Sequence, residues 1–168
     1  ADAAYLRSLG LPGLDVAPDP QLQVYLDESV PFIGADKLKR QGIGGKGIRV
    51  LVMDTGVDVD HFDLKDAVVD QICTLKPADR CGPEGKPADD KDGHGTHVAG
   101  IIASRGKRSE FGVAPEAEIV AMKFLEERAS GAGSNMVEAL DLVLKRDDIH
   151  IINMSLGTNL LYTGSCDA

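Results

Sequence analysis

The segment "DGHGTHVAGIIAS" (Asp92 to Ser104) places two histidines, His94 and His97, three residues apart among glycines, and an apolar run follows at once. The spacing of that run is typical of one helix face, which is formed by Val98, Ile101 and Ile102. We therefore expect a helix over residues 97–104, with this face anchored in a hydrophobic core. The glycines beside His94 let other backbone segments pass closely, so the helix can hold His94 rigidly.

Strand-like and helix-like segments alternate on both sides of this helix. The segments "IRVLVMD" (48–54), "AEIVAMKFL" (117–125) and "IHIINMSLG" (149–157) are predicted to be strands. A second helix is predicted over residues 134–146, where Ser134 can act as the N-cap. Its apolar face consists of Met136, Val137, Leu140, Val143 and Leu144. Because apolar strands separated by helices are typical of a covered parallel sheet, we predict an α/β fold with a doubly wound, mostly parallel sheet and helices on both faces.

Composition sets the class of protein. The chain has 168 residues, of which 43% are hydrophobic, and this suits one globular domain with its own core. Its net charge of -9 argues against a nucleic-acid partner, because binding to phosphates needs a basic surface. No apolar run is long enough to cross a bilayer.

The first 30 residues differ from the rest of the chain. They contain Pro12, Pro18 and Pro20 with little hydrophobic periodicity, which predicts an extended arm or linker. Their start, "ADAAYLRSLG", lacks the basic and then apolar order of a signal peptide, so we expect that any export signal has already been removed.

The chain has three cysteines, Cys73, Cys81 and Cys166. The first two flank a polar loop and could close a small disulfide, which would leave Cys166 free or paired outside this chain. Three reduced cysteines are the equally weighted alternative.

Glycine-rich "GIGGKG" (42–47) is interpreted as a surface turn. A dinucleotide-binding loop follows its strand and opens a helix, whereas this segment precedes a strand.

Asp54 and His94 are the candidates for chemistry. Asp54 ends a buried strand, where open parallel sheets place functional groups, although aspartate is also a common turn residue. A histidine at a helix N-terminus tends to stay neutral, and a buried aspartate can offset this by accepting its other ring proton. Such a pair fixes the tautomer of the histidine, as in the triad of a hydrolase.

The segments "VLVMDTG", "DGHGTHVAGII", "GVAPEAEIVAMKFL" and "IINMSLG" resemble, in order and context, those of the subtilisin-like serine proteases. The resemblance covers about Val30 to the end of the chain. It implies that Asp54 is the triad aspartate, that His94 is the general base and that residues 31–168 are the amino-terminal portion of the catalytic domain. His97 is then predicted to be a packed core histidine.

The resemblance also implies a substrate cleft for an extended polypeptide. One wall would consist of Ser155, Leu156 and Gly157, and the other of Gly131, Ala132 and Gly133. A peptide between these walls would add a strand through main-chain hydrogen bonds. The family resemblance further implies a secreted or extracytoplasmic endopeptidase, in which residues 1–30 stand where an inhibitory propeptide joins the enzyme.

The family's nucleophilic serine and oxyanion-hole asparagine are expected beyond residue 168. We therefore predict that this chain supplies aspartate and histidine only and is inactive alone. It would need the remaining carboxy-terminal segment, or a second copy, to cover its apolar sheet edge and helix face.

No cofactor is expected for the chemistry. For a structural calcium ion, the resemblance points to Asp63 and the loop "SRGKRSEFG" (104–112), but this loop is basic and poor in oxygen ligands, which disfavours calcium there. Asp89, Asp90 and Asp92 form another acidic group, for which a solvated loop is the favoured interpretation.

Two other functions remain open. A metal-dependent hydrolase is suggested by His94 and His97, but zinc helices space their histidines at i and i+4 and not at i and i+3. A non-catalytic peptide-binding module would keep the groove and lack the nucleophile.

Overall fold

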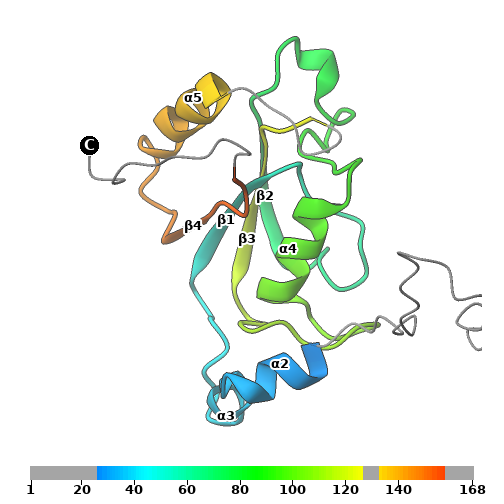
Figure 1. The fold of residues 1–168 in the computed structure, drawn as a ribbon, viewed down its shortest axis with the longest axis vertical. Coiled ribbons are helices and arrows are strands. Elements are labelled where there is room, and N and C mark those ends of the chain that lie inside the picture. The colour runs from blue at the N-terminus through cyan, green and yellow to red at the C-terminus, as the bar shows by residue number, and fades with distance from the viewer. Residues whose placement is uncertain (1–25, 127–132, 158–168) are drawn as a thin grey trace, which may run out of the picture.

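The computed structural model describes residues 26–126 and 133–157 (Figure 1). Two short helices come first, and strands and helices then alternate. In chain order the elements are α2 (Leu26–Phe32), α3 (Ala35–Arg40), β1 (Arg49–Asp54), β2 (Val68–Cys73), the 3-10 helix η1 (Ala78–Arg80), α4 (His94–Ala103), β3 (Glu118–Lys123), α5 (Gly133–Val143) and β4 (Ile151–Asn153).

The strands form one parallel sheet of four strands in the order β2-β3-β1-β4. The three predicted strands are therefore confirmed as β1, β3 and β4. Strand β2 was not predicted, because Asp70 and Gln71 interrupt its apolar pattern. It lies at an edge of the sheet, where one flank of a strand meets solvent and polar side chains are tolerated.

The side chains of β1 and β3 point alternately to two hydrophobic layers. On one face, Val98 and Ala99 of α4 pack with a cluster that includes Val50 and Ile119. On the other face, the cluster around Leu51 includes residues of α5. The two helices lie on opposite sides of the sheet, which confirms the predicted doubly wound arrangement (Figure 1).

The buried face of α4 differs from the predicted one. The helix begins at His94, three residues earlier than predicted, and its buried residues are Gly95, Val98, Ala99 and Ala103. Ile102 is half-buried against the same cluster, whereas Ile101 is exposed. Small residues at this face let α4 lie close to the sheet, and one helical step of 100° turns Ile101 away from it.

The prediction for α5 holds for part of its face. Met136, Leu140 and Val143 contact the core, whereas Val137 and Leu144 are exposed. The prediction of Ser134 as the N-cap is wrong, because α5 already begins at Gly133 and Ser134 is therefore inside the helix.

Helix α2 runs across residue 30, where the sequence pattern placed the end of an extended arm. Residues 26–30 are therefore helical and not extended. Residues 1–25 lie outside the described residues.

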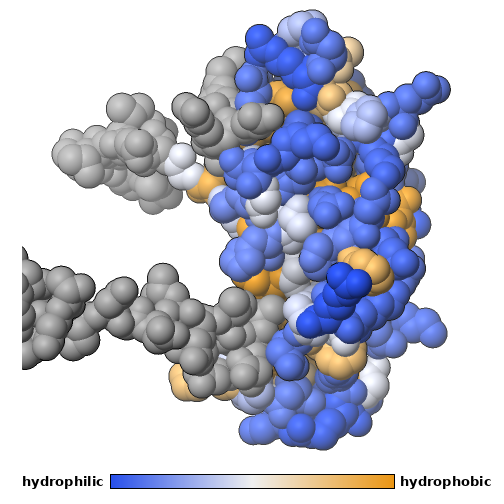
Figure 2. All heavy atoms as spheres, turned by 90° about the vertical axis from the view of Figure 1, so that its right-hand side faces the viewer, coloured by the Kyte–Doolittle hydropathy of each residue, from blue (hydrophilic) through white to orange (hydrophobic). Residues whose placement is uncertain are grey.

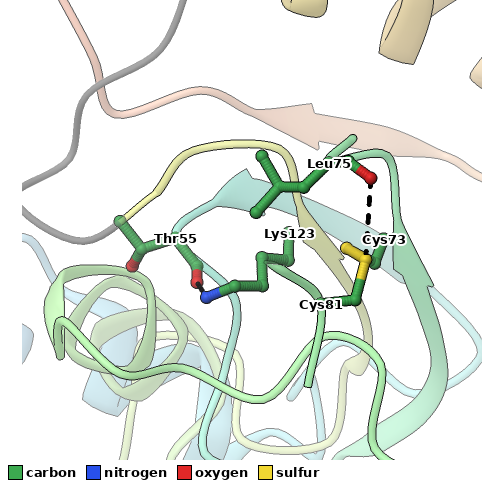
Figure 3. Close-up of a disulfide and its surroundings, with 5 residues drawn as sticks. All are labelled: Thr55, Cys73, Leu75, Cys81 and Lys123. Carbon is green, nitrogen blue, oxygen red and sulfur yellow. Dashed lines mark hydrogen bonds between the residues drawn. A yellow bond between two sulfur atoms is a disulfide. The ribbon is translucent and has the colours of Figure 1, made fainter. Parts of the chain in front are cut away.

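Cys73 at the end of β2 is bonded to Cys81, which confirms the first of the two cysteine interpretations (Figure 3). The disulfide ties the start of the loop between β2 and α4 back to the sheet. Cys166 lies outside the described residues.

The face that carries α4 is mostly hydrophilic, with small apolar areas between the polar ones (Figure 2). Within the described ranges, no helix has the length and apolar character needed to span a membrane.

Candidate active site

Asp54 is the last residue of β1 and is completely buried, with an exposed fraction of 0%. Its backbone oxygen accepts hydrogen bonds from the N–H groups of Phe124 and Leu125, which fasten the strand end to β3 and the residues after it. Its carboxylate oxygen Oδ1 lies 2.7 Å from the backbone nitrogen of Thr55 and 2.8 Å from Nδ1 of His94. The structure thus brings the two predicted residues into direct contact at the carboxyl end of the sheet.

His94 begins α4 after Gly93, which has a positive φ of 101°. A side chain at Gly95 would not fit, because its Cβ would lie 2.1 Å from the backbone oxygen of Gly56 and 3.0 Å from Cβ of Asp54. The glycine therefore allows the close approach that brings the imidazole to the carboxylate. The His94 side chain is 42% exposed, so one ring edge contacts Asp54 while the ring remains accessible.

The contact determines the tautomer of His94. A carboxylate can only accept hydrogen bonds, so Nδ1 carries the hydrogen and Nε2 of the neutral ring is left as the acceptor. A neutral imidazole in this tautomer is suited to take a proton from a nucleophile at Nε2.

The carboxylate also outweighs the effect expected from the helix N-terminus. The hydrogen bond with Asp54 raises the pKa of His94 above its ordinary value of 6.5, burial lowers it, and the negative charges of Asp54, Asp92 and Asp90 raise it further. The effect of Asp54 on the pKa of His94 is therefore larger than the opposing effect of the helix N-terminus. The Asp54 carboxylate stabilises the imidazolium formed during proton transfer.

Asp90 organises the start of α4, which corrects its interpretation as a member of a solvated acidic loop. Its Oδ1 accepts hydrogen bonds of 3.0 Å from the backbone of Asp92 and Gly93, and its Oδ2 accepts from the backbone and hydroxyl of Thr96 at 3.0 and 2.6 Å. Burial acts to raise the pKa of Asp90, but these hydrogen bonds hold it below its ordinary value. The carboxylate thus caps the turn that carries His94.

His97 is exposed, and its prediction as a packed core residue is wrong. It lines a surface hollow of about 490 Å³ together with His61, whereas His94 faces Asp54. Residues at i and i+3 on a helix differ in direction by 60°, and here that difference separates the surroundings of the two rings. In the part of the chain that the structure describes, no group of three or more His, Cys, Asp or Glu residues is placed to hold a metal ion.

Asp63 does not fit a calcium ion. Its carboxylate is buried, with an exposed fraction of 1%, and accepts hydrogen bonds from the backbone of Lys107, Arg108 and Ser109 and from the Ser109 hydroxyl. Burial acts to raise the pKa of Asp63, and these donors lower it below its ordinary value. N–H groups occupy the oxygens that would ligate a cation, so the basic loop is anchored by hydrogen bonds.

The predicted substrate walls are described only in part. Gly131 and Ala132 lie outside the described residues, and Gly133 begins α5. Ser155, Leu156 and Gly157 follow β4 on the exposed edge of the sheet, and the Ser155 hydroxyl donates to the side chain of Asn153 at 2.9 Å. Their role in substrate binding stays a prediction.

Sequence reasoning assigned no role in the site to Thr55, which it placed only at the end of the strand, or to Lys123. The Thr55 hydroxyl accepts a hydrogen bond from the backbone of Gly95 at 3.0 Å, and Nζ of Lys123 donates to the Thr55 backbone oxygen at 2.8 Å. The signal in the sequence was a lysine, Lys123, directly after the apolar run "IVAM" (119–122).

Comparison with known protein families shows to which family the chain belongs. The model of the Subtilase family matches residues 45–168, which include β1, α4, β3 and the Asp54–His94 pair. The chain therefore belongs to the Subtilase family.

Known proteases are similar to most of this chain. The Minor extracellular protease Vpr of Bacillus subtilis (strain 168) is 36% identical over 143 residues, covering 80% of this chain and 17% of the relative. The Thermostable alkaline protease of Halalkalibacterium halodurans is 34% identical over 147 residues, which cover 84% of this chain and 38% of the relative. The Major intracellular serine protease of Bacillus subtilis (strain 168) is 37% identical over 134 residues, which cover 79% of this chain and 41% of the relative. The chain thus spans less than half the length of these relatives.

Proposed function

We propose that this chain supplies the aspartate and histidine of a serine endopeptidase with an Asp-His-Ser triad. The observation that carries the proposal is the 2.8 Å contact between Nδ1 of a half-exposed His94 and a completely buried Asp54. Asp54 orients the ring and stabilises its protonated form, and Nε2 is the proton acceptor. The names of the similar proteases support the same reaction.

The nucleophilic serine comes from outside these 168 residues. Its hydroxyl oxygen attacks the carbonyl carbon of the peptide bond while His94 takes the hydroxyl proton. His94 then gives this proton to the leaving amine, and water hydrolyses the remaining ester. One buried oxygen of Asp54, Oδ2, has no hydrogen-bond donor among the described residues, which is consistent with a site that a further segment completes.

The substrate is an extended polypeptide. Residues 155–157 continue from the edge strand β4, where backbone groups can pair with an added strand. The family resemblance assigns residues 131–133 to the same substrate site. Recognition through main-chain groups implies broad endopeptidase specificity.

The protein acts in a secreted or extracytoplasmic setting, and residues 1–30 are the tail of a propeptide or a linker. The disulfide between Cys73 and Cys81 supports an oxidising compartment. One similar protease is extracellular by name and another is intracellular by name.

The reaction class is tested by inactivation of the full-length protein. A serine-directed organophosphorus inhibitor should abolish hydrolysis of casein, because the nucleophile that His94 activates attacks its phosphorus atom, displaces the leaving group and stays covalently phosphorylated. A zinc chelator at the same concentration should leave hydrolysis unchanged. Loss of activity with the chelator alone would favour metal-dependent hydrolysis, and a folded protein without any activity would favour a binding module.

The remaining segment of the catalytic domain covers the β4 and α5 side of this chain. Leu144 after α5 is 82% exposed, and large apolar side chains are exposed along the sheet edge at Ile151, Ile152, Met154 and Leu156. The edge of β4 that does not face β1 has no neighbouring strand among the described residues. Such a surface is stable in water only when another segment covers it.

We expect residues 1–168 produced alone to be inactive on casein and to self-associate, because they present this apolar surface and lack the nucleophile. Light scattering after size-exclusion chromatography measures the association, and a casein assay measures the activity. The matched control replaces exposed Leu144 and Ile151 by Lys and should associate less. An active, monomeric 168-residue chain would overturn this prediction.

A further inference from the structure

Lys123 is a buried lysine that the proposed mechanism does not use. It is the last residue of β3, and only 4% of its surface is exposed. None of the ion pairs among the described residues includes Lys123, and the acceptor of its ammonium group is the backbone oxygen of Thr55, 2.8 Å from Nζ. Because an ammonium group is costly to bury, its place beside this one carbonyl group needs a physical reason.

Thr55 connects this lysine to both members of the Asp54–His94 pair. Thr55 is completely buried, and its backbone N–H donates to Oδ1 of Asp54 at 2.7 Å. Its hydroxyl oxygen accepts from the N–H of Gly95 at 3.0 Å, the residue after His94. The carbonyl of Thr55 accepts a hydrogen bond from Lys123. The N–H, the hydroxyl and the carbonyl group of Thr55 are therefore each hydrogen-bonded to a different residue.

The backbone around Lys123 is itself held in place. Lys123 pairs with Asp54 in the register of β1 and β3 and with Cys73 in the register of β2 and β3. Its backbone oxygen accepts from the N–H of Thr74 at 3.0 Å. Figure 3 shows the Lys123 side chain extending to the Thr55 carbonyl, with the disulfide of Cys73 and Cys81 nearby. The Lys123 side chain therefore extends to Thr55 from a strand that pairs with a neighbour on each side.

We propose that Lys123 is a positioning residue for the catalytic pair, and this proposal rests on the proposed function above. Lys123 holds the Thr55 carbonyl, which fixes the orientation of the Thr55 residue. That orientation keeps the Thr55 N–H on the carboxylate of Asp54 and the Thr55 hydroxyl on the first turn of α4. Lys123 thus sets the distance between Asp54 and His94 without contacting the substrate.

The test is a double-mutant cycle in the full-length protein with Lys123→Met and Asp54→Asn. Lys123→Met removes the donor and keeps an unbranched side chain. It should lower kcat by about 10- to 100-fold with KM nearly unchanged, because a misplacement of about 1 Å in a catalytic group costs this much. In the Asp54→Asn background the same substitution should lower kcat by less than about threefold, since residues that act as a unit are not additive.

Lys91→Met is the matched control, because Lys91 and Lys123 line a second surface hollow, separate from that of His61 and His97, but Lys91 pairs with Asp89 in an exposed position. It should leave kcat unchanged. The hydrogen on Nδ1 of His94 provides a second readout, and its proton NMR resonance should broaden or disappear in Lys123→Met and persist in Lys91→Met.

Equal losses of kcat for Lys123→Met in both backgrounds would show a structural role and overturn the proposal. If Lys123→Met does not fold, Lys123→Leu, which also removes the donor to the Thr55 carbonyl, takes its place in the cycle with the same criterion. A full-length Asp54→Asn variant with normal kcat would instead contradict the proposed function itself.

Discussion

The His94→Ala variant of the full-length protein is expected to lose peptide hydrolysis by about 10⁴-fold or more, whereas His97→Ala should keep measurable activity. The reason is geometric. Nδ1 of His94 is held by buried Asp54, which leaves Nε2 to take the proton of the nucleophile. His97 lies on the same helix but lines a surface hollow with His61, so it is not held by this carboxylate.

The two histidine variants form a matched pair, because each removes an exposed imidazole from the same helix. Initial rates on a peptide substrate measure the loss, and circular dichroism with thermal unfolding shows that both variants fold. Comparable losses in two well-folded variants would refute the assignment of His94 as the base.

The Asp54→Asn variant is expected to lower kcat by about 10⁴-fold with little change in KM. An asparagine amide can donate a hydrogen bond to Nδ1, which favours the neutral tautomer with its hydrogen on Nε2 and leaves no base toward the nucleophile. Steady-state kinetics measure the loss, and Asp60→Asn on the exposed side of the 58–61 turn is the control. A loss of only tenfold would make Asp54 a structural residue.

The same substitution should change the pH dependence in a defined direction. The contact with Asp54 raises the pKa of His94 above 6.5, so kcat/KM should rise as the pH increases through this raised value and His94 loses its proton. Without the carboxylate the pKa falls, and the residual activity of Asp54→Asn should rise at lower pH. NMR titration of the His94 ring measures both values, and an unchanged midpoint would contradict the electrostatic role of Asp54.

The sequence predicted the elements that carry strong hydrophobic patterns. The central residues of β1 and β3, 50–53 and 119–122, are apolar and buried on both faces of the sheet, a pattern typical of a covered parallel strand. Edge strand β2 has one flank in solvent and therefore tolerates polar residues. These residues interrupt its apolar pattern, so the sequence did not predict this strand. The periodicity of α4 predicted a helix but not which side chains turn inward, since a start three residues earlier and small residues at Gly95 and Ala99 select the buried face.

The sequence by itself determined the family pattern, the parallel α/β class and the candidates Asp54 and His94, because local motifs and hydrophobic periodicity are properties of contiguous residues. Only the tertiary structure decided what those residues contact. It brought Asp54 to His94 across 40 positions, turned Asp63 to backbone donors that leave no place for calcium, and buried Lys123 against Thr55. Strand register and the approach of α4 to the sheet govern these contacts, and both depend on packing between distant segments.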